Sequence, residues 1–382
     1  MPLNYHDLVA QAKREIREIS VDDLASRSAA PPLIVDVREP QEFATGTIVG
    51  AVLIPRGVLA STIVEAAPDL ATEIVLLCSH GNRSALAAKE LQDLGYRTVA
   101  SLAGGFTAWR ASGGEAVLPA DPSAARYARH LVLPGVGASG QRRLGAARVL
   151  IVGAGGLGSP VALYLAAAGV GTIGIVDDDV VDVSNLQRQV LHTTDAVGTF
   201  KVASAVRALA ALNPEVRVVG HPQRLDASTA LAIMSGYDVV VDGSDNFPTR
   251  YLLNDAALRL RIPVVHGSVF RWEGQCTVID PYRGPCYRCL FPQPPPPDLA
   301  PDCAEAGVFG AVAGVVGSLM AVEVAKLILG IGDPLVGRLM VFDGQSGRTD
   351  DLTVRRDPMC PACVDEDRPP ALIDYDASCR PG

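Results

Sequence analysis

A glycine-rich turn at residues 153–158 constrains the fold of this 382-residue chain more than any other feature. The apolar, β-branched run R-V-L-I-V precedes the turn, and a stretch with helical apolar spacing follows it and stops at Gly169. A second apolar run, residues 172–176, ends at Asp177. This order predicts a nucleotide-binding α/β unit, because the helix N-terminus favours phosphates and the acid suits a ribose hydroxyl. A turn that is tight only for packing is the alternative.

The residues after Asp177 indicate which nucleotide the unit binds. Asn, Arg and Lys side chains follow in S-N-L-Q-R-Q (184–189) and V-G-T-F-K (197–201). A nicotinamide cofactor has no need of them, whereas the transition state of adenylyl transfer gathers charge that Arg and Lys neutralise. We therefore favour ATP, with an NAD-dependent Rossmann oxidoreductase as the alternative. The candidate nucleotide-binding residues here are Gly153, Gly155, Gly156, Gly158, Asp177, Asp179, Asn185, Arg188, Gln189 and Lys201.

A third apolar run, residues 237–241, leads into D-G-S-D-N (242–246). Open α/β sheets bind their ligands at this end of the strands. Asp245 is therefore a candidate ligand for Mg²⁺, which takes one or two carboxylates together with phosphate oxygens. Asn246 is a further candidate for nucleotide binding, and a helix N-cap is the alternative for it.

The N-terminal part of the chain has a small α/β pattern of its own, in which Cys78 stands out. It follows the apolar run 73–77 directly, in C-S-H-G-N-R-S, and helical spacing resumes from residue 84 to 94. Loop N–H groups and a helix N-terminus there favour a thiolate. A buried structural cysteine is the alternative. A phosphatase loop needs one residue more between its cysteine and its arginine than separates Cys78 from Arg83, so the smaller loop suits a sulfane sulfur.

Residues 18–114 resemble the rhodanese family of sulfurtransferases. The matching motifs are D-V-R-E (36–39), E-F (42–43), G-T-I-V-G-A-V-L-I-P (46–55), C-S-H-G-N-R-S (78–84) and G-G-F-T-A-W (104–109). The resemblance implies that Cys78 carries a persulfide within a loop of backbone amides. It also implies that Arg83 closes the loop and favours an anionic sulfur donor. Asp36 and Arg38 are then expected to be structural.

Residues 123–366 resemble the ubiquitin-activating-enzyme-like adenylyltransferases of the bacterial MoeB and ThiF kind. The nucleotide motifs above match this family, as do R-Y-A-R (126–129), E-G-Q (273–275), P-C-Y-R-C (285–289) and C-A-E-A-G-V (303–308). The resemblance implies that Arg188 and Lys201 contact the phosphates of ATP and that Asp245 binds Mg²⁺. It further implies that Arg129 reaches into the ATP site of a neighbouring subunit, so that the active form is a homodimer.

Four of the eight cysteines form two C-x-x-C pairs. Two such knuckles match tetrahedral thiolate ligation of structural Zn²⁺, and two redox pairs are the alternative. Cys303 follows a proline-rich stretch and is a candidate relay nucleophile, although an inert role is equally open. Cys276 is expected in the core, and Cys379 is expected to have no role. The candidate zinc ligands are Cys286, Cys289, Cys360 and Cys363.

Composition and charge limit the partners and the cellular location that we expect for the protein. The net charge is −9 and no Lys/Arg cluster indicates nucleic-acid binding. The first nineteen residues lack the apolar segment of a signal peptide. The apolar run 308–322 leads into Glu323 and Lys326, so we expect a buried core helix rather than a membrane span. We expect a soluble, cytoplasmic protein without membrane partners.

We predict an α/β chain with a rhodanese-like domain at 18–114 and a Rossmann-like, zinc-containing adenylyltransferase domain at 125–366. An arm (1–17), a linker (115–124) and a tail (367–382) complete the division. The family resemblances imply that a ubiquitin-like sulfur-carrier protein with a C-terminal Gly-Gly is adenylated and then converted to a thiocarboxylate by the Cys78 persulfide. The carrier's pathway stays open, as does the donor, which is thiosulfate or a cysteine desulfurase. A non-enzymatic adaptor is disfavoured, because none of the expected catalytic residues is missing.

Overall fold

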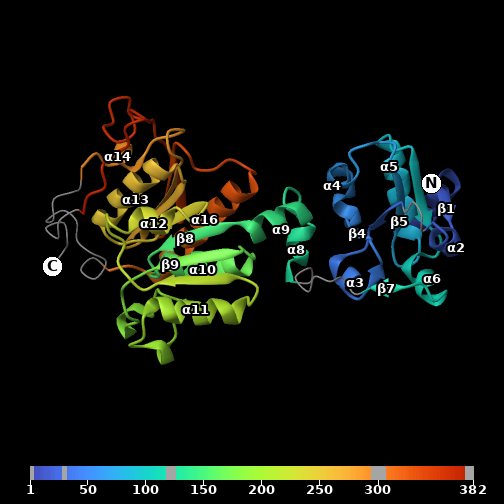
Figure 1. Ribbon diagram of the computed structural model, residues 1–382, viewed down its shortest axis with the longest axis horizontal. Helices are drawn as coiled ribbons and strands as arrows, with labels where there is room; N and C mark the ends of the chain where they lie inside the picture. The colour runs from blue at the N-terminus through green and yellow to red at the C-terminus, as the bar shows by residue number, and fades with distance from the viewer. Residues whose placement is uncertain (1–3, 28–31, 118–125, 294–306, 375–382) are drawn as a thin grey trace. The chain divides into compact units, whose positions relative to one another are not determined.

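The computed structural model describes residues 4–27, 32–117, 126–293 and 307–374 (Figure 1). The chain divides into two compact units, residues 1–141 and 142–382. Each unit has a sheet of its own, so each is described by itself.

The first unit is built on a five-stranded sheet in the order β1-β6-β5-β2-β4. All of its pairings are parallel. Apolar clusters cover it, one including Leu59, Ile63 and Leu91 and another including Phe106 and Trp109. The strands are β1 (Arg17–Ile19), β2 (Leu33–Asp36), β4 (Val52–Leu53), β5 (Glu73–Leu77) and β6 (Thr98–Leu102), and β3 (Thr47–Ile48) pairs separately with β7 (Ala116–Val117).

Several helices of this unit start at an N-cap residue or a glycine. Ser20 and Asp23 form the capping box of α2, as their spacing predicts. Helix α1, in the segment that the sequence marks only as a charged helix or arm, packs against α5. The helices are α1 (Tyr5–Glu15), α2 (Val21–Ala25), α3 (Pro40–Ala44), α4 (Leu59–Ala66), α5 (Asn82–Asp93) and α6 (Gly105–Ala111), with the short η1 (Arg56–Val58); α8 (Ala128–Leu131) and α9 (Gly137–Ala146) lead into the second unit.

The second unit is built on an eight-stranded sheet in the order β10-β9-β8-β11-β12-β13-β14-β15. The first five strands are parallel and the last three antiparallel. Strand β8 lies between β9 and β11, so the chain changes direction across the sheet at the carboxyl end of β8. The strands are β8 (Arg148–Val152), β9 (Thr172–Val176), β10 (Arg217–His221), β11 (Val239–Asp242), β12 (Val264–Phe270), β13 (Glu273–Ile279), β14 (Arg338–Asp343) and β15 (Arg348–Thr353).

The long apolar helix of the second unit is α16, which packs against α10, β12 and β13. By length and composition it is long enough to cross a membrane, but 50% of its apolar stretch is buried inside the protein. The expected core helix is therefore found in the core. The helices are α10 (Gly158–Ala167), α11 (Lys201–Leu212), α12 (Ala230–Met234), α13 (Phe247–Leu260), α14 (Tyr287–Leu290) and α16 (Gly310–Leu329), with η2 (Val183–Asn185) and η3 (Thr194–Ala196).

Candidate functional site

A cavity of about 440 Å³ lies in the second unit at the carboxyl ends of β8, β9 and β11. This is the position at which open α/β sheets bind ligands, and the volume suits a small molecule. It is lined by Gly153, Gly155, Gly156, Asp177, Asp179, Asn185, Arg188, Gln189, Lys201, Asp245 and Asn246, together with Gln223, Arg224 and Arg250 among others. The structure thus brings nearly all the sequence-predicted nucleotide residues to one place.

The glycine-rich turn has a backbone that only glycine fits. Gly153 has φ +94°, and a Cβ atom there would lie 2.8 Å from the Gly243 carbonyl oxygen. At Gly158 a Cβ atom would lie 1.8 Å from the Gly153 oxygen, which is impossible without moving the turn. Gly158 itself does not line the cavity: it starts α10 and closes the turn. The turn therefore brings its backbone and the start of α10 to the cavity.

Asp177 is held at the edge of this turn by two backbone amides. Its carboxylate accepts from the Ala154 N–H at 2.8 Å and from the Asp179 N–H at 2.9 Å. Burial raises the pKa of Asp177, while the charge of Lys201 and these two bonds act against the increase. A carboxylate fixed in this way can still accept hydrogen bonds from a ribose, since each oxygen offers a second lone pair.

The cations predicted to meet phosphates lie on either side of the turn. Lys201, the first residue of α11, is buried and forms an ion pair with Asp179 at 2.7 Å. Arg188 donates to Asn185 Oδ1 at 2.8 Å. The buried Gln189 Oε1 has no hydrogen-bond partner among the described residues, so it is an acceptor available to a ligand. The cations are therefore held in position by polar contacts within the cavity.

Buried Asp242 and His266 support the loop that carries Asp245. Asp242 accepts from the backbone N–H of Ser244 at 3.1 Å and lies 2.7 Å from His266 Nδ1. Asn246 caps α13 by accepting from the Thr249 N–H at 2.9 Å, as its cap interpretation predicts, and it also lines the cavity. Asp245 is exposed there, so its carboxylate is open to a cation.

Several cavity residues were missed by the sequence analysis. Arg250 donates to the Ser244 carbonyl oxygen at 3.2 Å, and its buried Nε has no hydrogen-bond partner in the described chain. It lies one helical turn beyond Asn246, and that spacing could have revealed it. Gln223 and Arg224 follow β10 and carry no motif. His192 does not line the cavity, but its contact with the Ala154 carbonyl oxygen at 2.9 Å supports the turn.

In the first unit, Cys78 follows β5 and lies in a loop that ends at the start of α5. Its Sγ accepts from the Gly81 N–H at 3.1 Å and from the Ser84 hydroxyl at 3.5 Å. Burial alone would raise the pKa of Cys78, but the Ser84 hydroxyl and the backbone amides of Ser84, His80 and Gly81 outweigh it and lower the pKa below its usual value. The loop is therefore built to hold a thiolate or another anionic sulfur.

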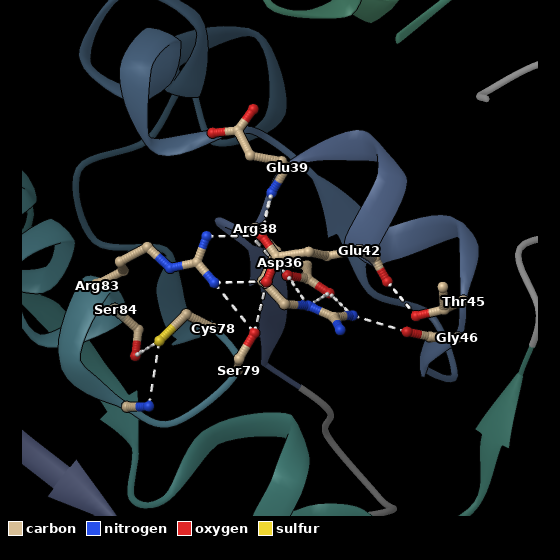
Figure 2. A network of polar contacts seen from close by, with 11 residues as sticks. Asp36, Arg38, Glu39, Glu42, Thr45, Gly46, Cys78, Ser79, Arg83 and Ser84 are labelled. Atoms are coloured by element: carbon tan, nitrogen blue, oxygen red, sulfur yellow. Dashed lines mark hydrogen bonds and ion pairs between the residues drawn. The ribbon is translucent and has the colours of Figure 1, made fainter. Parts of the chain in front are cut away.

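Arg83 is already paired with a carboxylate. Its Nη1 and Nη2 donate to the two carboxylate oxygens of Glu42, at 2.7 and 2.6 Å, and Nη2 also donates to Ser79 Oγ at 3.0 Å (Figure 2). This qualifies the expectation that Arg83 favours an anionic donor, because a carboxylate already neutralises its charge. The pairing joins residues 41 positions apart, which motif spacing does not reveal.

Asp36 and Arg38 form a second, deeper pair in the same network. Arg38 Nη2 lies 2.6 Å from Asp36 Oδ2, and both side chains are buried. Arg38 also donates to the Gly46 carbonyl oxygen at 2.7 Å, and the Thr47 hydroxyl donates to Asp36 at 2.8 Å. These contacts tie β2 to Gly46 and to the start of β3, which is the structural role expected from the sequence.

The two C-x-x-C pairs converge on one centre. The Sγ atom of Cys286 lies 3.8 Å from that of Cys289 and 3.6 Å from that of Cys360, and Cys289 and Cys363 are also 3.6 Å apart. Sulfurs on a tetrahedron with a Zn–S distance of about 2.3 Å would be about 3.8 Å apart. The convergence favours one four-sulfur metal site over two separate redox pairs.

One candidate among the described residues is not brought into these sites. Arg129 is exposed on α8, and it does not line the cavity in the described chain. Cys303 and Cys379 lie outside the described residues. Cys276 is buried in β13, where burial raises its pKa, so it belongs to the core as expected.

The cavity with its arginines, lysine and acids defines a nucleotide-using α/β enzyme, and the Cys78 loop defines a sulfur-handling domain in the same chain. Comparison with known protein families supports both assignments. Residues 127–362 match the ThiF family, and residues 20–112 match the rhodanese-like domain. The chain belongs to the ThiF family, with a rhodanese-like domain at its N-terminal side. The family match contradicts the alternative of an NAD-dependent oxidoreductase.

The chain is also similar to individual proteins of known name or structure. A "sulfur carrier protein adenylyltransferase" of Thermus thermophilus is 55% identical over 259 residues, 66% of this chain and 96% of that protein. The "probable adenylyltransferase/sulfurtransferase MoeZ" of Mycobacterium tuberculosis is 50% identical over 67% of this chain, but the match spans only 64% of MoeZ. A crystal structure of Escherichia coli MccB with ATP has a TM-score of 0.56 and 26% identity, covering 63% of this chain and 75% of MccB.

Proposed function

We propose that this enzyme adenylates the C-terminal Gly-Gly carboxylate of a ubiquitin-like sulfur-carrier protein and then replaces the adenylate with sulfur from Cys78. The observation that carries the proposal is the presence, in one chain, of a cavity of about 440 Å³ lined by cations and of a loop that stabilises a cysteine thiolate. The names of the Thermus and Mycobacterium relatives support both halves of the reaction.

In the first step the carrier carboxylate attacks the α-phosphate of ATP, giving an acyl-adenylate and pyrophosphate. Arg188 and Lys201 would neutralise the charge that develops on the phosphates, and Asp177 would hold the ribose. Lys201 would exchange its ion pair with Asp179 for one with the nucleotide. Asp245, exposed in the cavity, would hold Mg²⁺, which neutralises phosphate charge when bound.

In the second step sulfur replaces AMP. The terminal sulfur of the Cys78 persulfide attacks the acyl carbon, and AMP leaves, which produces an acyl disulfide. A thiol then cleaves the sulfur–sulfur bond and releases the carrier thiocarboxylate; Cys303 is a candidate for this thiol, and an external dithiol would restore the reduced enzyme. Joining both domains on one chain raises the effective concentration of the sulfur.

The four-cysteine centre is proposed to hold structural Zn²⁺. Its sulfur spacings fit the tetrahedral geometry, and four protein ligands leave no open position for catalysis. The centre is tied to α13 because Tyr287 N–H donates to Asn254 at 2.8 Å and Arg288 pairs with the buried Asp255 at 2.8 Å. Zinc would thereby stabilise the helix that begins at Asn246.

The active form is proposed to be a homodimer in the cytoplasm. The proposal of a homodimer is supported by Arg129, which is exposed on α8 and could therefore contact the ATP site of a neighbouring subunit. The carrier belongs to a molybdopterin, thiamine or related sulfur-transfer pathway.

Carrier-dependent ATP–pyrophosphate exchange tests the adenylation step. Replacing Arg188 with Ala should slow exchange about a hundredfold, because one group that stabilises charge in the transition state is lost. Arg207→Ala is the matched control, since Arg207 is an exposed arginine of α11 away from the cavity lining. If no Gly-Gly carrier supports exchange by the wild-type enzyme, the proposed adenylation is wrong.

A further inference from the structure

Several contacts hold the Glu42 carboxylate against Arg83. Besides the two bonds from Arg83, its carboxylate accepts from Ser79 Oγ at 2.7 Å and from the Glu39 N–H at 3.2 Å. The last bond belongs to the capping box of α3, so the helix start orients the carboxylate. Glu42 is thus a positioned partner of Arg83 rather than a chance surface contact.

The pair removes the charge that an anionic donor would use. Bonds from Arg83 to Glu42 hold the pKa of Glu42 at about 2, so this carboxylate is ionised at physiological pH. Three of the five N–H groups that a guanidinium carries are taken by Glu42 and Ser79. Glu39 adds a further negative charge that acts on Arg83. The loop's own cation is therefore neutralised.

The Cys78 thiolate is held mainly by groups other than Arg83, although the charges of Arg83 and Cys78 also interact. The groups that lower the pKa of Cys78 are the Ser84 hydroxyl and the loop amides. The pairing of Arg83 with Glu42 can therefore affect which donor approaches while the Ser84 hydroxyl and the loop amides continue to hold the thiolate.

We propose that Glu42 sets the donor specificity of the Cys78 loop, disfavouring dianionic donors such as thiosulfate and directing the loop to sulfane sulfur carried as a cysteine persulfide. This inference rests on the proposed sulfurtransferase function. Thiosulfate brings two negative charges and a sulfonate that needs hydrogen-bond donors, whereas Glu42 and Ser79 already take three of the five N–H groups of Arg83. A cysteine persulfide presents the sulfur to be transferred without a sulfonate group.

The transfer step is balanced for the favoured donor. The Cys78 thiolate attacks the outer sulfur of the donor R–S–SH, a new sulfur–sulfur bond forms at Cys78, and the donor's own sulfur–sulfur bond breaks. The bonding electron pair leaves with the donor as the thiolate R–S⁻, and the proton stays on the transferred sulfur. No further oxidant or reductant is required.

Glu42→Gln in the full-length protein tests the inference, because glutamine keeps the shape and the capping role but not the charge. Cys78 persulfidation would be followed by the added mass of one sulfur, with sodium thiosulfate and with cysteine persulfide as donors. The ratio of kcat/KM for thiosulfate over cysteine persulfide should rise about fivefold, the effect of one nearby charge in water. The change should lie in KM for thiosulfate.

Three further variants make the result specific. Glu73→Gln is the matched control, since Glu73 pairs with Arg27 in the same domain and should leave the ratio unchanged. The double variant Glu42→Gln/Arg83→Ala should lose the gain. Arg83→Ala alone should shift the ratio the other way by exposing the Glu42 charge, and this tests the inference even if Glu42→Gln fails to fold.

The outcomes separate this inference from the proposed function. If Cys78 accepts sulfur from neither donor in the wild-type protein, the sulfurtransferase function itself is wrong. If Cys78 accepts sulfur but the donor ratio is the same in wild type and Glu42→Gln, or the double variant keeps the gain, then Glu42 does not set donor specificity.

Discussion

At the scale of single residues, the two reactive centres rely on backbone groups and fixed partners more than on isolated charges. Gly81 N–H and the Ser84 hydroxyl approach the Cys78 sulfur, and Ser84 is itself held by Ser101 Oγ at 2.8 Å. In the cavity, Asp177 is held by two amides and Lys201 by Asp179. The orientations of Cys78, Asp177 and Lys201 are therefore set before a substrate arrives, which lowers the cost of binding.

Ser84→Ala should raise the pKa of Cys78, because the hydroxyl bond that favours the thiolate is lost. In the wild type the pKa lies below its usual value, so alkylation by iodoacetamide should rise with pH earlier than for a free cysteine and then level off. In the variant this rise should move to higher pH. Ser61→Ala is the control, since its hydroxyl bonds only the Val58 carbonyl oxygen on another helix. An identical pH profile in wild type and Ser84→Ala would contradict the account.

At the scale of elements, α13 joins the cavity to the four-cysteine centre. It begins at Asn246 beside the cavity, and further along it carries Asn254 and Asp255, which hold α14 next to Cys286. Asp255 is almost fully buried, so its ion pair with Arg288 cannot be replaced by water. The stability of the centre and the position of this helix are therefore linked.

Arg288→Ala should lower the free energy of unfolding of the second unit by about 3 kcal/mol, because it leaves the Asp255 carboxylate buried without that partner. The measurement is denaturant unfolding of the full-length protein, with release of bound zinc recorded in parallel. Arg283→Ala should change little, because Arg283 is 82% exposed in its pair with Asp280. An unchanged unfolding midpoint in Arg288→Ala would contradict the proposed link.

The sequence predicted the elements that local pattern controls. Strands β5 and β9 have the predicted bounds, and the expected helices after Cys78 and after the glycine-rich turn differ from α5 and α10 by one or two residues. Convergence of the four cysteines was also predicted, because thiolate ligation demands it.

What the sequence did not reveal depends on contacts between distant segments. The Glu42–Arg83 pair, the place of Arg224 at the cavity and the Asp255–Arg288 link all join residues from separate elements. Neither periodicity nor motif spacing reports which side chains such elements bring together. The motif likewise identified Arg83 as a cation of the Cys78 loop, but it did not identify Glu42 as the carboxylate that neutralises it.

At the scale of the whole molecule, the chain consists of two units that each have their own sheet and core. The nucleotide cavity is lined by the second unit, and the Cys78 loop lies in the first. The account therefore assigns adenylation to one unit and sulfur supply to the other, so that a change in one active site should leave the chemistry of the other intact.

The most direct test combines two readouts on the wild type and Cys78→Ala: carrier-dependent ATP–pyrophosphate exchange, and the mass of the carrier after a sulfur donor is added. The account predicts that Cys78→Ala keeps wild-type exchange but forms no thiocarboxylate, whereas Arg188→Ala loses both. If Cys78→Ala still produces the thiocarboxylate at the wild-type rate, or if it loses exchange while remaining folded, the division of labour between the two units is contradicted.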